Sequence, residues 1–133
     1  MDLIKRKGEK VGPIKDIMHK IKYSVQGLWY CYTHETSFII ETIFVILVVI
    51  FGIIFKIAFM EWVFSLLTMA LIMEVELLNT GIEAVVDLVT EEYHPLAKIA
   101  KDCGSGATFI SSMLALAVNL IIFAPKILPL IFK

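Results

Sequence analysis

The chain has 133 residues, of which 59% are hydrophobic, and a formal net charge of only -1. Soluble domains usually contain about 45 to 50% apolar residues, so this composition and a mean hydropathy of +0.84 exclude an ordinary soluble domain. The length allows about three spans of roughly 20 residues and one surface helix, which predicts an all-α integral membrane protein with a single domain over 1–133.

The N-terminal region is basic, because seven of the twelve Lys and Arg residues lie in the first 22 positions. Residues 1–12 are predicted to form a mobile basic tail that contacts anionic lipid headgroups and not nucleic acid. Pro13 suits the first turn of a helix. Over 13–34 apolar residues recur three or four positions apart, which predicts an amphipathic helix on the membrane surface or, equally well, against the transmembrane helices.

Three apolar segments follow. The first is predicted to span the membrane over 38–59, and a tight turn at 60–62 leads to a second span over 62–90. Residues 90–106 are polar and contain Pro and Gly, which predicts a loop. The third span is predicted over 107–123.

The distribution of basic residues predicts the orientation in the cell membrane. With the N-terminus in the cytoplasm, the basic N-terminal region, Lys98 and Lys101 lie inside, while Lys56, Lys126 and Lys133 lie outside. This excess of positive charge inside favours a cytoplasmic N-terminus. The cytoplasmic ends of the second and third spans would then face soluble nucleotides.

The second span carries polar side chains along one face. Glu76, Asn79, Glu83 and Asp87 fall within one narrow sector at about 100° per residue. Because an ionisable side chain at membrane depth costs at least about 2.5 kcal/mol, these residues need a partner, a metal or water. A polar contact between helices and a proton relay are the non-enzymatic alternatives to an active site.

Other residues around this face suggest phosphoryl transfer. Hard divalent cations prefer carboxylates, and Glu35 and Glu83 are candidates to supply them. Lys101 is placed to neutralise phosphate charge, and a partly buried carboxylate can take a proton from an alcohol. The sequence has no Gly-rich phosphate loop of the Walker type.

Two motifs carry a specific resemblance. The first is Glu76-Leu-Leu-Asn79-Thr-Gly-Ile-Glu83-Ala-Val-Val-Asp87, and the second is Glu92-Tyr93-His94-Pro95 followed by Ala100-Lys101-Asp102. Together with Glu35-Thr-Ser-Phe38 they resemble the small prokaryotic diacylglycerol kinase family, over about residues 16–128. Glu61-Trp62 and His94-Pro95-Leu96 look most like its Gram-positive branch, whose members phosphorylate undecaprenol.

This resemblance implies a homotrimeric bundle of three-span subunits with composite sites at the cytoplasmic interface, using ATP and Mg²⁺. It implies that Glu76 is the general base and that Glu35 and Glu83 bind the metal. Ser105 matches a position near the lipid substrate. The positions that match nucleotide contacts are Tyr23, Asn79, Asp87, Glu92, Tyr93, His94, Lys101 and Asp102.

Some positions depart from the family pattern. Asp16 and Ile39 stand where relatives often have basic or polar residues, and Cys103-Gly-Ser-Gly106 is a hybrid of the diacylglycerol kinase and undecaprenol kinase patterns. This hybrid loop leaves both lipids open as the acceptor. The motifs of the Gram-positive branch make undecaprenol the preferred acceptor, with diacylglycerol as the alternative and a non-kinase transporter or proton relay as a more remote one. Glu74 lies about 160° from Glu76, where it would contact a neighbouring subunit.

Overall fold

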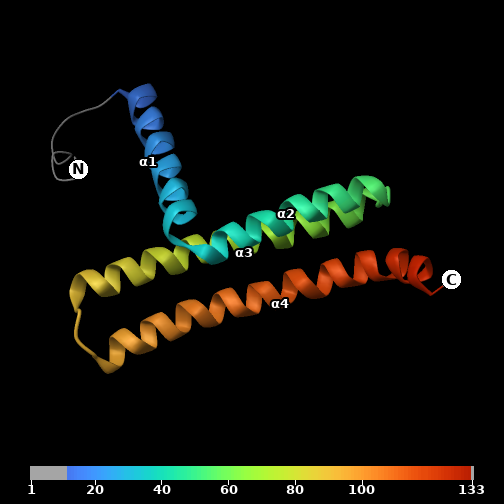
Figure 1. Cartoon of the computed structure of the whole chain (residues 1–133). Coiled ribbons are helices and arrows are strands. Elements are labelled where there is room, and N and C mark those ends of the chain that lie inside the picture. Colours follow the sequence, from blue (N-terminus) through green and yellow to red (C-terminus); the bar gives the residue numbers. More distant parts are fainter. Residues whose placement is uncertain (1–11, 133) are drawn as a thin grey trace.

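The computed structural model describes residues 12–132, and over this range the chain is helical apart from short connections (Figure 1). The predicted tail lies outside the described residues, except for Gly12. The four helices are α1 (Pro13–His34), α2 (Thr36–Ile54), α3 (Phe59–Val89) and α4 (Pro95–Ile131). The prediction of an all-α fold is confirmed.

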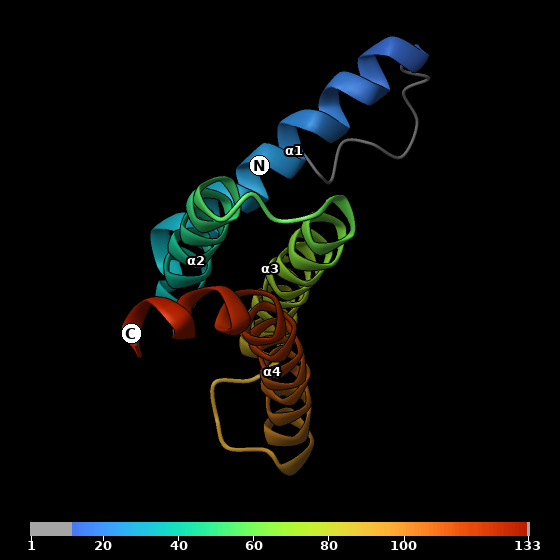
Figure 2. The same ribbon diagram turned by 90° about the vertical axis from the view of Figure 1, so that its right-hand side faces the viewer.

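Helices α2, α3 and α4 are each long and apolar enough to cross a membrane. They run side by side in Figure 1, and Figure 2 shows them nearly end-on, with α2 and α4 on different sides of α3. Many large apolar side chains on these helices are exposed, for example Ile53, Leu67 and Ile110. This exposure is expected of surfaces that face lipid, and it agrees with the prediction of a membrane protein.

Helix α1 leaves the other three helices at a steep angle (Figure 1). It begins at Pro13, and only its last turns contact the bundle, where Cys31 is 2% exposed. Ile14, Ile17 and Val25 are exposed on the rest of the helix. The exposed apolar side chains fit a helix that lies on a membrane surface, which remains a prediction.

The connection between α2 and α3 lies earlier than predicted, at residues 55–58 instead of 60–62. Lys56 adopts a left-handed backbone conformation with φ 48°. Its N–H donates to the Ile53 carbonyl (3.3 Å), and the Ile57 N–H donates to the Gly52 carbonyl (3.1 Å). These two bonds form a Schellman motif, which ends α2 there. The Glu61 carboxylate then accepts from the Ala58 N–H (2.7 Å) and caps the start of α3.

Helix α4 begins within the segment predicted as a loop and extends past the predicted span of 107–123. Only residues 90–94 separate it from α3. His94 Nδ1 accepts a hydrogen bond from the Leu96 N–H (3.2 Å), and Pro95 occupies the first turn, so the polar residues that suggested a loop instead start a helix. At the other end, Lys126 binds Glu61 Oε1 (2.7 Å), which ties α4 to the start of α3.

A small core lies between the three long helices at the end far from α1. It contains Val48, Met69, Ala115, Ile122 and Phe123. Polar side chains join α3 and α4 beside it, since Ser65 Oγ donates to Asn119 Oδ1 (2.5 Å). Hydrogen bonds of this kind between membrane helices contribute about 0.6–2 kcal/mol each, so they help to align α3 with α4.

Candidate active site

The predicted site residues lie at two levels along α3. The hairpin of α3 and α4 extends beyond the point where α2 begins (Figure 1). Glu76 lies level with the first turn of α2, because it contacts Ser37. Asp87 lies eleven residues further along α3, about 16 Å away. The inner level, with Glu76, therefore lies within the three-helix bundle. The outer level, with Asp87, lies on the part of the α3–α4 hairpin that extends past α2.

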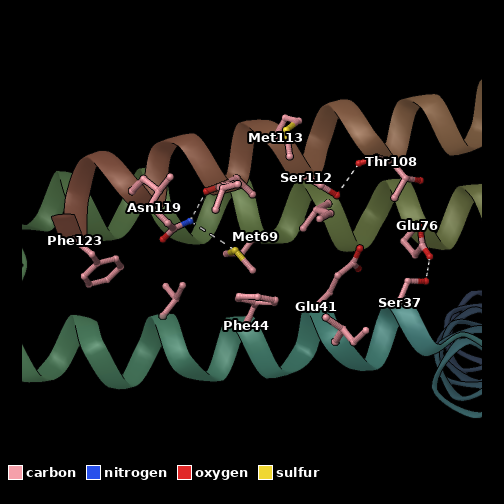
Figure 3. Close-up of a pocket in the computed structure, with 16 residues that line it drawn as sticks. Ser37, Glu41, Phe44, Met69, Glu76, Thr108, Ser112, Met113, Asn119 and Phe123 are labelled. Carbon is pink, nitrogen blue, oxygen red and sulfur yellow. Dashed lines mark hydrogen bonds between the residues drawn. The ribbon is translucent and has the colours of Figure 1, made fainter. Parts of the chain in front are cut away.

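At the inner level two carboxylates are buried between the helices. Glu76 on α3 is 5% exposed and accepts a hydrogen bond from Ser37 Oγ, and Glu41 on α2 is 7% exposed. In Figure 3 both side chains point into the space between α2 and α4. Within the described part of the chain, Glu41 Oε2 has no hydrogen-bond partner. A buried carboxylate oxygen that lacks a donor is available to a ligand or a water molecule.

These carboxylates belong to one end of an apolar groove. The groove is bounded by α2, α3 and α4 and runs along them from Ser37 and Glu76 to Phe123 (Figure 3). Its walls are mostly apolar, with residues such as Phe44, Ile72 and Leu116. The arrangement places two carboxylates at the end of a channel suited to a hydrocarbon chain.

At the outer level the structure brings four of the predicted site residues together in two pairs. Lys101 Nζ on α4 lies 2.6 Å from Asp87 Oδ1 on α3. Asn79 Nδ2 donates to Glu83 Oε1 (3.1 Å) one turn earlier on α3. Asp102 forms its ion pair with Lys98 on the same helix, an exposed contact that contributes little to stability.

Asn79 also determines how closely α3 and α4 approach. Its Oδ1 is buried without a donor among the described residues and points at Gly104 on α4. A Cβ at position 104 would overlap this oxygen. Glycine at this crossing therefore lets Asn79 keep this position, and the close approach holds Asp87 and Lys101 within reach of each other.

The other predicted residues lie elsewhere in the described part of the chain. Tyr23 lies in the middle of α1, where its ring stacks on that of His19 with centroids 6.2 Å apart. Glu35 forms the junction of α1 and α2. Glu92 and Tyr93 are exposed in the connection before α4, His94 caps that helix, and Ser105 is exposed on it.

The predicted metal ligands are oxygen donors of the type that Mg²⁺ prefers. Among residues 12–132 no three His, Cys, Asp or Glu side chains form a cluster able to hold a metal ion. Glu83 uses one carboxylate oxygen to accept from Asn79, and Glu35 is half-buried at the helix junction. The donor chemistry fits Mg²⁺, while a full set of ligands requires phosphate oxygens, water or a second subunit.

The sequence interpretation missed Ser37 and Glu41. Glu41 is an acid within an apolar span, a signal in the sequence that indicates function by default and was sufficient to identify it. Ser37 had no such signal, because a single Ser in a first helical turn is common. Only the contact of α2 with α3 reveals that both residues adjoin Glu76.

Comparisons with known proteins give one consistent result. Residues 22–123 match the family model of prokaryotic diacylglycerol kinase. The chain is 35% identical to the undecaprenol kinase of Bacillus subtilis (strain 168) over 102 residues, which cover 77% of this chain and 83% of that protein.

Two diacylglycerol kinases are similarly related. The chain is 38% identical to that of Escherichia coli (strain K12) over 93 residues, which cover 70% of this chain and 76% of that protein. It is 34% identical to that of Synechocystis sp. (strain PCC 6803) over 116 residues, which cover 86% of this chain and 66% of that protein.

Proposed function

Because this chain belongs to the prokaryotic diacylglycerol kinase family, and is therefore a lipid kinase, we propose that it phosphorylates undecaprenol with ATP and Mg²⁺. The undecaprenol kinase of Bacillus subtilis aligns with 77% of the chain, which supports this acceptor. Diacylglycerol is the alternative, because several related proteins are diacylglycerol kinases. In either reaction the product is a phosphorylated membrane lipid.

The observation that carries the proposal is the apolar groove that ends at Glu76. A lipid alcohol would lie with its hydrocarbon chain between α2 and α4 and its hydroxyl beside this carboxylate. Glu41 Oε2 adds an acceptor for a hydrogen bond from a water molecule beside the bound lipid.

In the proposed reaction Glu76 takes the proton from the acceptor hydroxyl while the hydroxyl oxygen attacks the γ-phosphorus of ATP. The bond from this phosphorus to the β–γ bridging oxygen breaks, and ADP leaves. Ser37 orients this carboxylate by donating to Oε1. The attack is in line, and positioning and electrostatics supply most of the rate. Bound Mg²⁺ would neutralise charge on the phosphate oxygens, with Glu35 and Glu83 as its protein ligands.

Lys101 is the proposed contact of the transferring phosphate. In this structure the Lys101 ammonium forms an ion pair with Asp87. The ATP phosphates would therefore have to displace the Asp87 carboxylate or bind the ammonium together with it. Asn79, Asp87 and Asp102 would orient groups around the nucleotide. Tyr23, Glu92, Tyr93 and His94 are proposed to surround it, and Ser105 to lie near the lipid.

The placement of these parts on different elements supports a composite site. Tyr23 and Glu35 belong to α1 and its junction with α2, whereas Lys101 lies on the hairpin. A homotrimer in which α1 of one subunit lies against the hairpin of the next would bring them together. We propose this assembly, with the N-terminus and the sites on the cytoplasmic face.

A competition between the two acceptors tests the substrate. Purified protein in lipid vesicles would receive labelled ATP with undecaprenol and diacylglycerol supplied together in equal amounts. We expect most of the label in undecaprenyl phosphate. Label mainly in phosphatidic acid would establish the alternative acceptor, and label in neither, with ion flux in sealed liposomes, would support the relay.

Replacing Glu76 with Gln tests the assigned base. The amide keeps the size and the hydrogen-bonding ability of the side chain but cannot accept the proton, so kcat should fall by about 10²-fold or more. The matched control is Glu91→Gln in the exposed connection, which should leave kcat unchanged. Near-normal turnover of Glu76→Gln would show that another group is the base.

A further inference from the structure

The groove between α2 and α4 ends at a group of aromatic rings. Phe123 is the last residue along α4 that lines the groove. The centroid of its ring lies 6.3 Å from that of Phe51 on α2 and 6.4 Å from that of Phe55 at the C-terminal end of α2. We call these three residues the Phe123 cluster. In Figure 3 the Phe123 ring lies at the end of the groove opposite to Ser37 and Glu76, so the cluster joins α2 to α4 at the far end.

The groove is open along its walls and closed at this far end. Side chains of the walls are about half exposed, for example Phe44 (54%) and Leu116 (50%). At the far end, in contrast, Val48 and Phe123 are buried. A hydrocarbon chain in the groove can therefore leave it sideways between α2 and α4, but it meets packed side chains if it continues straight past Phe123.

The end of α4 supports the Phe123 cluster from behind. Pro125 lies within the helix and cannot donate to the carbonyl four residues earlier, which is a common cause of a bend. Figure 2 shows the last turns of α4 turned toward α2. Ile127 on these turns packs against the core that contains Phe123. The closed end of the groove is therefore a packed part of the fold.

The length of the groove limits how much of a chain it can enclose. Thr108 lies at the same end as Glu76 in Figure 3, and the residues of α4 that line the groove run from Thr108 to Phe123, about 22 Å. This is shorter than the apolar core of a bilayer, which is about 30 Å thick. An extended geranylgeraniol chain is about as long as the groove, whereas undecaprenol is much longer. The groove can therefore enclose only the part of undecaprenol that lies nearest to the hydroxyl.

We propose that the Phe123 cluster is the floor of the lipid site and sets the length of acceptor chain to which the protein responds. This inference rests on the proposed lipid kinase activity. Isoprene units between Glu76 and the floor gain van der Waals contacts with the walls and hold the hydroxyl in place. Units beyond the floor leave the groove sideways and lie among lipid tails, which are as apolar as the groove, so they add nothing to recognition.

A series of prenols of increasing length tests the floor. Purified protein in vesicles would receive labelled ATP with farnesol, geranylgeraniol, geranylfarnesol or undecaprenol at equal mole fraction in the membrane. We expect kcat/KM to rise at least about threefold from farnesol to geranylgeraniol, the step that reaches the floor, and to stay constant for longer chains. A continuous rise up to undecaprenol, or equal values for all four alcohols, would overturn the proposal.

Two substitutions should move this length limit in opposite directions. Phe123→Ala opens the floor, so geranylfarnesol should become at least about threefold better than geranylgeraniol. Leu116→Trp fills the groove about halfway along from an exposed wall, so the gain from farnesol to geranylgeraniol should vanish. The matched controls are Phe109→Ala and Leu114→Trp, at exposed positions of α4 that do not line the groove. Because Leu116 lies outside the packed core, its variant decides the question if Phe123→Ala does not fold. A wild-type length profile in either folded variant would contradict the floor.

Photolabelling separates this inference from the proposed reaction, because it needs no phosphoryl transfer. A geranylgeraniol analogue with a diazirine on its last carbon should label the Phe123 cluster, and one with a diazirine beside the hydroxyl should label residues near Glu76, as located by mass spectrometry of peptides. Label at the cluster without any phosphorylated prenol would support the floor and refute the proposed acceptor. Phosphorylated prenol with label spread over exposed positions such as Ile110 would support the kinase and overturn the floor.

Discussion

Asn79 shows how a single side chain links packing to the proposed chemistry. Its amide nitrogen donates to Glu83, and its oxygen lies against Gly104 where α3 and α4 cross. The residue was predicted as a nucleotide contact from the sequence. The structure adds a physical constraint, because the side chain has no space to move toward α4.

Gly104→Ala should therefore impair activity without unfolding the protein. The new methyl group overlaps Asn79 Oδ1, so Asn79 must turn away and lose its bond to Glu83, and kcat should fall by about tenfold, as expected when one hydrogen bond of about 1–1.5 kcal/mol is lost. The control is Gly106→Ala on the same helix, where a Cβ meets no atom within 4 Å. Its kcat should stay normal. Equal kcat for both alanine variants would show that Asn79 need not stay in place.

At the scale of single residues the sequence predicted which side chains form the polar face of α3, but it did not predict which residues of other helices contact that face. The polar face of Glu76, Asn79, Glu83 and Asp87 is visible in the sequence, because helical periodicity is a local property. The buried position of Glu41 and the hydrogen bond from Ser37 depend on which helix faces α3. Tertiary packing alone determines such neighbours.

The connection of α2 to α3 shows how an element boundary depends on backbone geometry. The sequence prediction placed the turn at the polar residues 60–62, but the chain turns at Lys56 in a left-handed conformation. Lysine carries a Cβ, so its presence there costs free energy that glycine would not.

Lys56→Gly should stabilise this connection. The left-handed conformation is free of strain in glycine, so we expect an increase of about 0.5–1 kcal/mol in the free energy of unfolding, measured by titration with sodium dodecyl sulfate in mixed micelles. Lys56→Ala removes the same charge and keeps the Cβ, so it should bring no gain. If the two variants were equally stable, removal of the charge, and not relief of the left-handed backbone conformation, would account for any change in the free energy of unfolding.

The docking of α1 depends on its final turns, where Cys31 is buried. Burial raises the pKa of the Cys31 thiol, and the carboxylates of Glu35 and Glu76 raise it further. The thiolate is the reactive form, so both burial and protonation slow the reaction of Cys31. Cys103 on α4 is exposed.

Maleimide labelling should therefore proceed in two phases in the folded protein. Cys103 should react at least about tenfold faster than Cys31 at neutral pH, and the slow phase should accelerate as the pH rises toward the pKa of Cys31. Mass spectrometry of the Cys103→Ser and Cys31→Ser variants would assign each phase. If the two cysteines react equally fast, α1 does not dock in the way that the structure describes.

The whole molecule combines three membrane-length helices with a hairpin that continues past the start of α2. This arrangement places the end of the groove that holds Glu41 and Glu76 beside the part of the α3–α4 hairpin that extends past α2. A lipid in the groove and a nucleotide at the hairpin would then approach the same carboxylates from opposite directions. The proposed reaction therefore requires this end of the protein to face the cytoplasm.

Labelling of cells with a membrane-impermeant maleimide tests that orientation. Cys103, on the hairpin, should react only after the cells are made permeable. Ala58→Cys in a Cys103→Ser background places a thiol in the exposed connection at the opposite end, and it should react in intact cells. The reverse pattern would show that the N-terminus is outside, contrary to the distribution of Lys and Arg.

The sequence by itself determined the membrane class, three apolar segments, the polar face of α3 and the resemblance to a kinase family. These are properties of composition and short-range order. It did not determine that α4 begins at Pro95, because the Gly, Pro and polar residues of 90–106 suit a loop equally well until His94 caps the helix and Gly104 packs on Asn79. It also did not reveal the groove, which α2, α3 and α4 form together. Only the tertiary structure decided the groove and the packing of Gly104 on Asn79, because both depend on contacts between residues distant in the chain, whereas the cap from His94 is local.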